Sequence, residues 1–92
     1  MSEICSVLAD VDDPELIGRF MECLLTEYEI EEVSSRWELV KLMDDGMSQR
    51  KIAQRLGLSL CKITRGSKEL KKDNSAFKIF IDLSKEKEKA EK

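Results

Sequence analysis

Apolar residues at helical spacing, interrupted by helix-capping residues and glycines, run along this 92-residue chain and limit the folds that it can adopt. Asp13 followed by Pro14 predicts a helix start, because aspartate caps a first turn and proline has no amide hydrogen to leave unpaired there. Over residues 16–25 apolar side chains then recur every three or four positions, which favours a helix with one buried face. No run alternates polar and apolar residues over the length of a strand, so we predict an all-α fold.

Further start and stop signals follow along the chain. Thr26 and Glu29 fit a capping box, in which each side chain accepts a hydrogen bond from the other residue's backbone amide, so a second helix should begin there. Its apolar pattern continues over residues 35–43 and should end at Asp-Asp-Gly, residues 44–46, where glycine can adopt the left-handed conformation. Asp-Asn-Ser at residues 73–75 predicts the break and cap before a last helix.

Two short helices are expected in between. Ser48 would cap the first helix and Ser59 the second, and Gly57 separates them. This arrangement is typical of a helix-turn-helix over about residues 48–69, whose second helix enters the major groove of DNA. An ordinary helical hairpin is the plainer alternative. The side chains expected to point inward are those of Ile52, Ala53, Leu56, Leu60 and Ile63.

Charge is distributed unevenly along the chain, whose net charge is −3. Residues 1–46 contain 13 acidic and 3 basic residues, residues 47–72 contain 1 and 8, and residues 73–92 contain 5 and 5. The basic block favours a polyanionic partner such as DNA, because Lys and Arg displace the counterions that condense on phosphate. A solvated helical surface would carry the same charges, and this alternative stays open on charge alone.

Other chemistries lack the residues that they need. The chain has three widely spaced cysteines and no histidine, so we expect no metal site and reduced thiols. We find no secretory signal pattern and no apolar run near the roughly 20 residues that span a bilayer, so a cytoplasmic protein that does not bind membranes is expected. Without histidine, a glycine-rich phosphate loop or a nucleophile beside a base, we predict that it is not an enzyme.

Motifs in the basic block resemble those of the Trp repressor family. The likeness rests on "MSQR" at 47–50 and "ITRGS" at 63–67, together with "LLTEYE" at 24–29 and Arg36. It covers about residues 23–72 and, more loosely, the last helix. The resemblance implies an intertwined homodimer with five to six helices per chain, which binds double-stranded operator DNA only when L-tryptophan is bound.

The resemblance also implies a tryptophan pocket shared between two chains. Arg36 and Arg65 would stack on the two faces of the indole, and Arg65 would pair with the ligand carboxylate. Arg36 could instead pair with Glu32 one turn earlier, and Arg65 could contact a phosphate. The remaining pocket residues would be Leu39, Gly66 and, from the other subunit, Thr26 with the backbone carbonyls of Cys23 and Leu25.

Two departures from the family pattern concern the ligand and the loop. Between Arg36 and Met47 the chain is one residue shorter, which we place near residues 44–46. The family's serine three residues after the TRGS glycine is Glu69 here, a carboxylate that could strengthen the contact with the ligand ammonium or repel the ligand carboxylate. Trp37 has no counterpart in the family and is expected in the core or a dimer interface.

Arg50 is the residue that we expect to read a base, because a guanidinium group can pair with both acceptors of guanine. A phosphate contact is its alternative role. Phosphate contacts are expected from Gln49, Lys62 and Thr64, and contacts through backbone N–H groups from Leu60 and Cys61.

We therefore predict one helical DNA-binding domain over residues 1–84 and a charged C-terminal tail, frayed or disordered, over residues 85–92. The protein would repress genes for tryptophan biosynthesis or uptake and would do so only when tryptophan is bound. Two alternatives remain. One is a helix-turn-helix regulator that needs no ligand, and the other is a helical adaptor for protein partners whose basic block is merely solvated.

Overall fold

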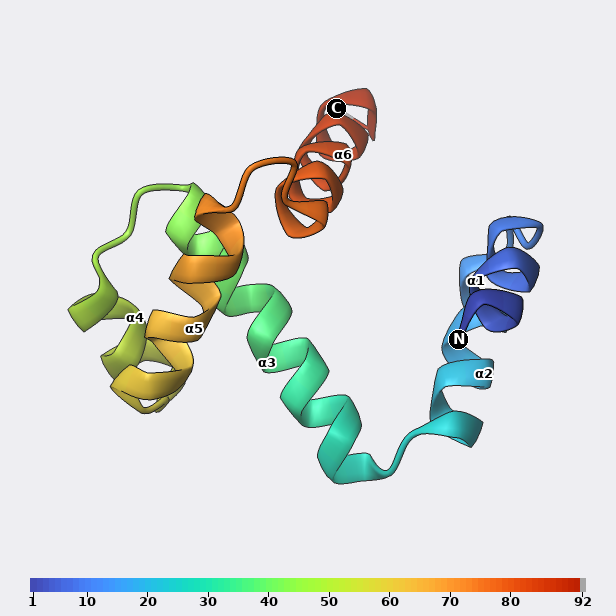
Figure 1. Ribbon diagram of the computed structural model, residues 1–92, viewed down its shortest axis with the longest axis horizontal. Coiled ribbons are helices and arrows are strands. Elements are labelled where there is room, and N and C mark those ends of the chain that lie inside the picture. The colour runs from blue at the N-terminus through green and yellow to red at the C-terminus, as the bar shows by residue number, and fades with distance from the viewer. Residues whose placement is uncertain (92) are drawn as a thin grey trace. The chain divides into compact units, whose positions relative to one another are not determined.

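The computed structural model describes residues 1–91, and that part of the chain is all-helical, as predicted. The chain forms two compact units, one of residues Met1–Val33 and one that begins at Ser34. The first helix was not predicted from the sequence. The helices are α1 (Ser2–Ala9), α2 (Pro14–Leu24), α3 (Glu27–Asp44), α4 (Gln49–Leu56), α5 (Leu60–Lys71) and α6 (Ala76–Glu91) (Figure 1).

Capping side chains define the starts of α2 and α3. The Asp13 carboxylate accepts a hydrogen bond from the Glu15 amide at 3.1 Å, with Pro14 in the first helical position. The predicted capping box is present at the start of α3. The Thr26 amide donates to Glu29 Oε1 at 2.9 Å, and the Glu29 amide donates to Thr26 Oγ1 at 3.1 Å. The Thr26 amide and then its hydroxyl lower the pKa of Glu29, because hydrogen bonds favour the ionised carboxyl.

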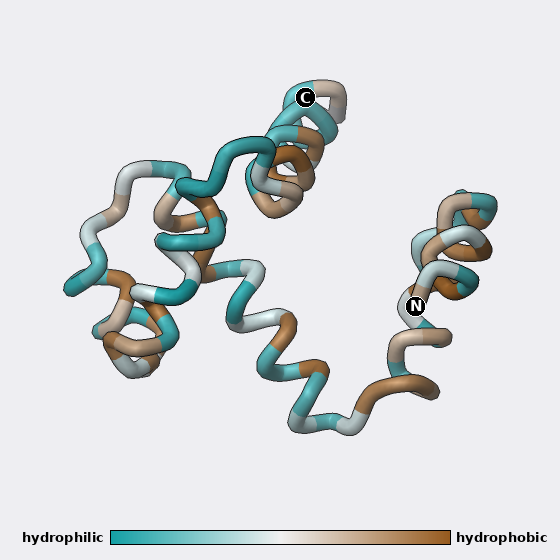
Figure 2. The backbone as a smooth tube through the Cα atoms, viewed as in Figure 1, coloured by the Kyte–Doolittle hydropathy of each residue, from teal (hydrophilic) through white to brown (hydrophobic). Residues whose placement is uncertain are grey.

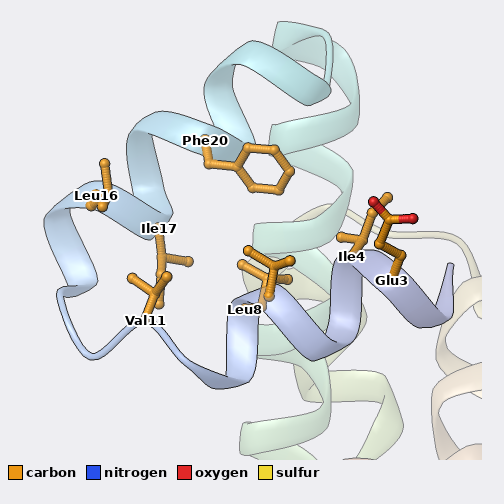
Figure 3. A pocket seen from close by; sticks show the side chains of 8 residues that line it. Glu3, Ile4, Leu8, Val11, Leu16, Ile17 and Phe20 are labelled. Atoms are coloured by element: carbon orange, nitrogen blue, oxygen red, sulfur yellow. The ribbon is translucent and has the colours of Figure 1, made fainter.

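An apolar groove lies between α1 and α2. Its walls include Ile4, Leu8, Ile17 and Phe20, whose side chains point toward one another, and its volume is about 380 Å³ (Figure 3). None of residues 1–33 is fully buried, and Phe20 is still 39% exposed. The first unit therefore presents much of its apolar surface rather than enclosing it.

The second unit has a small closed core. Leu39 of α3, Ile52 of α4 and Ile63 of α5 are at most 1% exposed and form one cluster, so α4 and α5 pack on the C-terminal part of α3. Leu60 was predicted to point inward, but it is 65% exposed, and this prediction is wrong. Leu58, in the turn before α5, packs against the core instead.

The two short helices meet at the predicted turn. Gly57 ends α4 in the left-handed conformation with φ of 65°, which a residue with a Cβ rarely adopts. Ser48 and Ser59 cap α4 and α5, accepting from the amides of Lys51 at 3.3 Å and Lys62 at 3.4 Å. The α5 helix continues past the predicted limit at residue 69 and ends at Lys71.

The last helix, α6, belongs to the second unit and contributes one fully buried side chain, Ile81. Trp37 of α3 is half-buried and stacks on Phe77 of α6, with ring centroids 6.1 Å apart and an interplanar angle of 25°. The predicted tail is helical as far as the structure describes it, and Lys85 and Glu88 form ion pairs with α3 and the loop that follows it. Residues 85–91 are thus part of α6, and residue 92 of the predicted tail lies outside the described residues.

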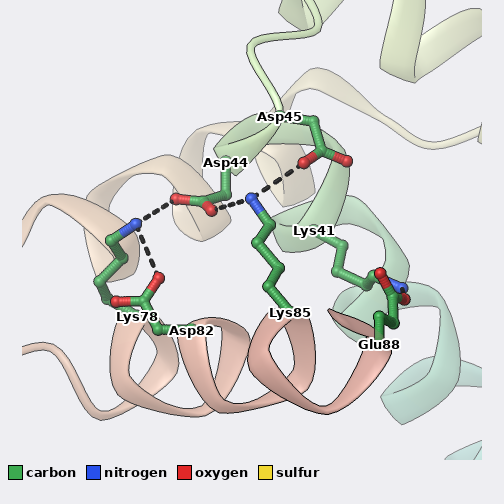
Figure 4. Close-up of polar contacts among 7 residues, drawn as sticks. All are labelled: Lys41, Asp44, Asp45, Lys78, Asp82, Lys85 and Glu88. Atoms are coloured by element: carbon green, nitrogen blue, oxygen red, sulfur yellow. Dashed lines mark hydrogen bonds and ion pairs between the residues drawn. The ribbon is translucent and has the colours of Figure 1, made fainter. Parts of the chain in front are cut away.

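A network of charges joins the end of α3 to α6 (Figure 4). The Asp44 side chain is only 10% exposed. Its Oδ1 accepts from Lys78 Nζ at 2.7 Å and its Oδ2 accepts from Lys85 Nζ. Lys85 also pairs with Asp45 at 2.9 Å, and Lys78 pairs with Asp82 at 3.1 Å. The Lys78 contact and then the Lys85 contact lower the pKa of Asp44, and both lysines have a raised pKa.

Acid should weaken this network. Because the pKa of Asp44 in the folded protein lies below its ordinary value of 3.8, its ionised form stabilises the fold above that pH, and this contribution is lost as the pH falls through the folded pKa. We expect urea unfolding midpoints of the wild type and Asp44→Asn to differ at neutral pH and to converge only as the pH falls below 3.8 and through the lowered pKa of Asp44. A difference that persists unchanged in strong acid would contradict this expectation.

Candidate nucleic-acid interface

Exposed basic and polar side chains open α4. Gln49, Arg50 and Lys51 are its first three residues, all are exposed, and the first turn contains no acidic residue. Positive charge at a helix N-terminus opposes the helix dipole, so Arg50 and Lys51 do not stabilise the helix that carries them. Their charges are placed where a polyanion could contact them.

A shallow depression of about 400 Å³ lies along the exposed face of α5. Its lining includes Thr64, Arg65 and Lys68 as well as Leu60 and Cys61 at the start of the helix. Lys68 was not predicted as a site residue, although it lies one helical turn after Thr64 and could have been placed on the same face from that spacing. Two positive charges and a hydroxyl thus gather on the face that a helix-turn-helix turns toward DNA.

The predicted DNA-contacting residues are all exposed, on two helices. Gln49 and Arg50 lie at the start of α4, and the other four lie on α5. Ser59 accepts from the Lys62 amide, while the earlier amides of α5 belong to the first turn, where no helical carbonyl precedes them. Three of these four line the α5 depression, namely Leu60, Cys61 and Thr64.

Gly66 brings α5 close to α3. A Cβ added at this position would lie 3.1 Å from Leu39 Cδ2 and 3.6 Å from Val40 Cγ2, closer than ordinary packing allows for the first of these atoms. Both Gly66 and Leu39 are buried. The structure therefore gives these two predicted pocket residues a role in helix packing.

The charged residues of the predicted ligand pocket lie at the surface of the second unit. Arg36 on α3 is exposed, and Arg65 is exposed in the α5 depression. The Glu69 carboxylate accepts from Lys72 Nζ at 2.9 Å, and its side chain is 44% exposed. Lys72 thus already neutralises part of the charge that distinguishes this chain from the family pattern.

The other predicted pocket residues belong to the first unit. Thr26 and Cys23 are exposed, Leu25 is half-buried, and the Thr26 hydroxyl already accepts from the Glu29 amide. Leu25 lines a depression of about 400 Å³ together with Ile30 and three carboxylates that the sequence reasoning missed. These carboxylates would attract an ammonium group, and their crowding around Thr26 in the sequence was the available signal. They are Glu22, Glu27 and Glu31.

The described residues also bear on metal sites, cysteine pairs and membrane spans. Among residues 1–91, no three metal-binding side chains of His, Cys, Asp or Glu gather closely enough to hold an ion. Cys5, Cys23 and Cys61 are exposed free thiols. None of the described helices is both long enough and apolar enough to cross a membrane.

Comparisons with known proteins point to one family. The family model for "Trp repressor protein" matches residues 1–85. The Trp operon repressor homolog of Chlamydia caviae is 39% identical over 80 residues, which is 86% of this chain and 76% of the relative. The Trp operon repressor homolog of Xylella fastidiosa M23 is 33% identical over 72 residues, which is 77% of this chain and 78% of the relative. No solved structure matches.

Proposed function

This chain belongs to the Trp repressor family of helix-turn-helix transcription regulators, which are not enzymes, and we propose that L-tryptophan gates its binding to operator DNA. The observation that carries the proposal is the exposed basic face of α4 and α5, held on the closed core of Leu39, Ile52 and Ile63. The regulated genes would serve tryptophan biosynthesis or uptake, and the protein would act in the cytoplasm.

DNA binding would use both short helices. In a helix-turn-helix the second helix enters the major groove and the first crosses the backbone, so α5 would contact bases and phosphates. Arg50 would read a base, and Gln49, Lys62 and Thr64 would hold phosphates. The amides of the first turn of α5 would add contacts with bases or bridging waters.

A homodimer is supported by the apolar surface that each unit leaves exposed. The α1–α2 groove is one such surface, and Ile79, Phe80 and Leu83 of α6 are 52–62% exposed on another. Hydrophobic positions recur along α1 and the first half of α6 in Figure 2. Exposed apolar patches of this kind mark interaction sites, and a second copy of the chain would cover them.

The ligand pocket would form only in that dimer. Arg36 and Arg65 of one chain would hold the indole and the carboxylate, with Leu39 and Gly66 behind them. Thr26 and the carbonyls of Cys23 and Leu25 from the other chain would receive the ammonium group, in the acidic surroundings described above. Tryptophan would favour the dimers whose two α5 helices are spaced by about one DNA turn, ~34 Å, so gating is a shift of population.

Selection of duplexes from a random pool, followed by anisotropy titrations, tests the proposal. We expect the selected duplex to bind more tightly when L-tryptophan is present and its affinity to fall steeply with salt concentration. Equal affinity with and without tryptophan would favour the regulator that needs no ligand. Failure to select any duplex, with weak dependence on salt, would favour the protein-binding adaptor.

Arg50→Ala should weaken binding to the selected duplex by about 1–3 kcal/mol and relax the sequence preference at one position. The reason is that a guanidinium group paired with guanine discriminates among bases, whereas a phosphate contact does not. Arg55→Ala is the matched control, since Arg55 is an exposed arginine in the last turn of the same helix. Uniform weakening on all duplexes would assign Arg50 to a phosphate.

Glu69→Ser should strengthen L-tryptophan binding about two- to fivefold, the range of exposed ionic interactions. Glu69 lies one helical turn after Arg65, so its charge opposes the ligand carboxylate. Tryptamine, which has the ammonium group but no carboxylate, should bind more weakly to the variant. Calorimetric titration measures both changes, and unchanged affinity for both ligands would place residue 69 outside the pocket.

A further inference from the structure

We propose that Asp44 is a positioning residue for DNA recognition, because it ties α6 to the end of α3, where the loop to α4 begins. The DNA readout of this inference rests on the function proposed above. Its structural part does not, because it concerns only α3, α4 and α6 and can be measured without DNA. For this purpose we call Asp44, Asp45, Lys78 and Lys85 the Asp44 clamp.

The Asp44 clamp fixes both oxygens of one carboxylate. Lys78 and Lys85 are two turns apart on the same side of α6 and converge on Asp44, one on each oxygen (Figure 4). Ile81 lies between the two lysines in the sequence and is fully buried, so the same face of α6 also makes an apolar contact. Lys41 adds a further tie between α3 and α6, since its ammonium lies 3.3 Å from the Glu88 carboxylate. An apolar contact flanked by ion pairs holds the helix in one orientation.

A short loop, held by backbone hydrogen bonds, connects the Asp44 clamp to the start of α4. Lys85 also holds Asp45, the first residue after α3. The Gly46 amide donates to the Met43 carbonyl at 3.0 Å, and the Met47 amide donates to the Leu42 carbonyl at 3.1 Å. Ser48, the next residue, caps α4. Because the loop is bonded back to α3, a change in the orientation of Asp44 would be transmitted to the first turn of α4.

The two lysines of the Asp44 clamp form ion pairs within the protein. Lys78 and Lys85 have carboxylate partners on α3 and its loop, so these two cations serve to hold α6 rather than to bind phosphate. Phe80 and Leu83 of α6 are 62% and 55% exposed, the surface proposed above to meet a second copy. The clamp would thus connect the dimer surface of α6 with the DNA-reading helices and set their spacing.

Three variants of α6 test the clamp. Lys85→Met removes both of its ion pairs, Lys85→Arg keeps a cation there, and Lys89→Met removes one exposed charge four residues later. NMR measures amide hydrogen exchange at Gly46 and Met47. Anisotropy with bound L-tryptophan measures the ratio of affinities for the selected duplex and a scrambled duplex. For Lys85→Met we expect exchange roughly tenfold faster and a ratio roughly tenfold lower, with wild-type values for the other two variants.

The outcomes distinguish a failure of the Asp44 clamp from a failure of the proposed function. Wild-type exchange and a wild-type ratio in Lys85→Met would overturn the inference, and so would an equal fall in the ratio for Lys89→Met, because charge alone would then explain it. If Lys85→Met does not fold, Asp45→Asn removes only the second bond of Lys85 and should show smaller changes in the same direction. A wild-type protein that prefers no duplex would refute the proposed function, and the exchange rates would still decide the clamp.

Discussion

Replacing Arg65 by alanine is expected to abolish the increase in DNA affinity that L-tryptophan produces. Arg65 is exposed beside Gly66 on α5, and in the proposed pocket its guanidinium group both covers the indole and pairs with the ligand carboxylate. Couplings between two ligands typically change affinity about 5- to 150-fold, and we expect this factor to fall to one. Anisotropy titrations with and without tryptophan measure it directly.

Lys68→Ala is the matched control for this experiment. Lys68 lies in the same α5 depression, is exposed, and carries the same charge, but it has no place in the proposed pocket. Its loss should weaken DNA binding to a similar extent with and without tryptophan, because it removes only attraction to phosphate. Tryptophan enhancement that survives in Arg65→Ala, or disappears in Lys68→Ala, would contradict the proposed pocket.

Ile63→Ala is expected to lower the free energy of unfolding by about 2–5 kcal/mol. Ile63 is fully buried at the junction of α3, α4 and α5, and a small domain cannot close the resulting cavity without moving one of these helices. Urea unfolding followed by circular dichroism measures the loss. In so small a core, a loss of this size removes a large part of the stability.

Leu60→Ala provides the comparison on the same helix. Leu60 is also a large aliphatic residue, but it is 65% exposed, so its loss should change the free energy of unfolding by less than about 0.5 kcal/mol. Losses of similar size for the two variants would mean that the start of α5 is packed differently from the arrangement described above.

Local signals predicted most of the fold. The caps at Asp13, Ser48 and Ser59 are formed by side chains that bond amides two or three residues away, so the sequence contains both partners close together. The α1 helix was missed because its N-cap, Met1, offers no side-chain hydrogen bond. Leu60 was misplaced because helical spacing does not say whether the turn residue Leu58 or Leu60 fills the edge of the core.

Contacts between residues far apart in the sequence could not be predicted from local signals. Asp44 bonds lysines 34 and 41 positions later, and the sequence offers many other lysines that could have been its partners. In the candidate site, Thr64 was predicted as a phosphate contact and Arg65 as a pocket residue, and both line the α5 depression, whereas the carboxylates beside Leu25 were not predicted. The proposed tryptophan pocket needs residues of two chains, and a pattern within one chain cannot join them, so the pocket stays a prediction.

The close approach of α5 to α3 at Gly66 also restricts how this sequence can change over evolution. A methyl group at position 66 would lie 3.1 Å from Leu39 Cδ2, so a larger residue there would push Leu39 or α5 aside by a few tenths of an ångström unless position 39 held a shorter side chain. The two positions should therefore vary together among descendants of this chain. In the proposed complex with DNA, a displaced α5 would change its tilt in the major groove, so an uncompensated substitution would alter DNA recognition before it unfolds the protein.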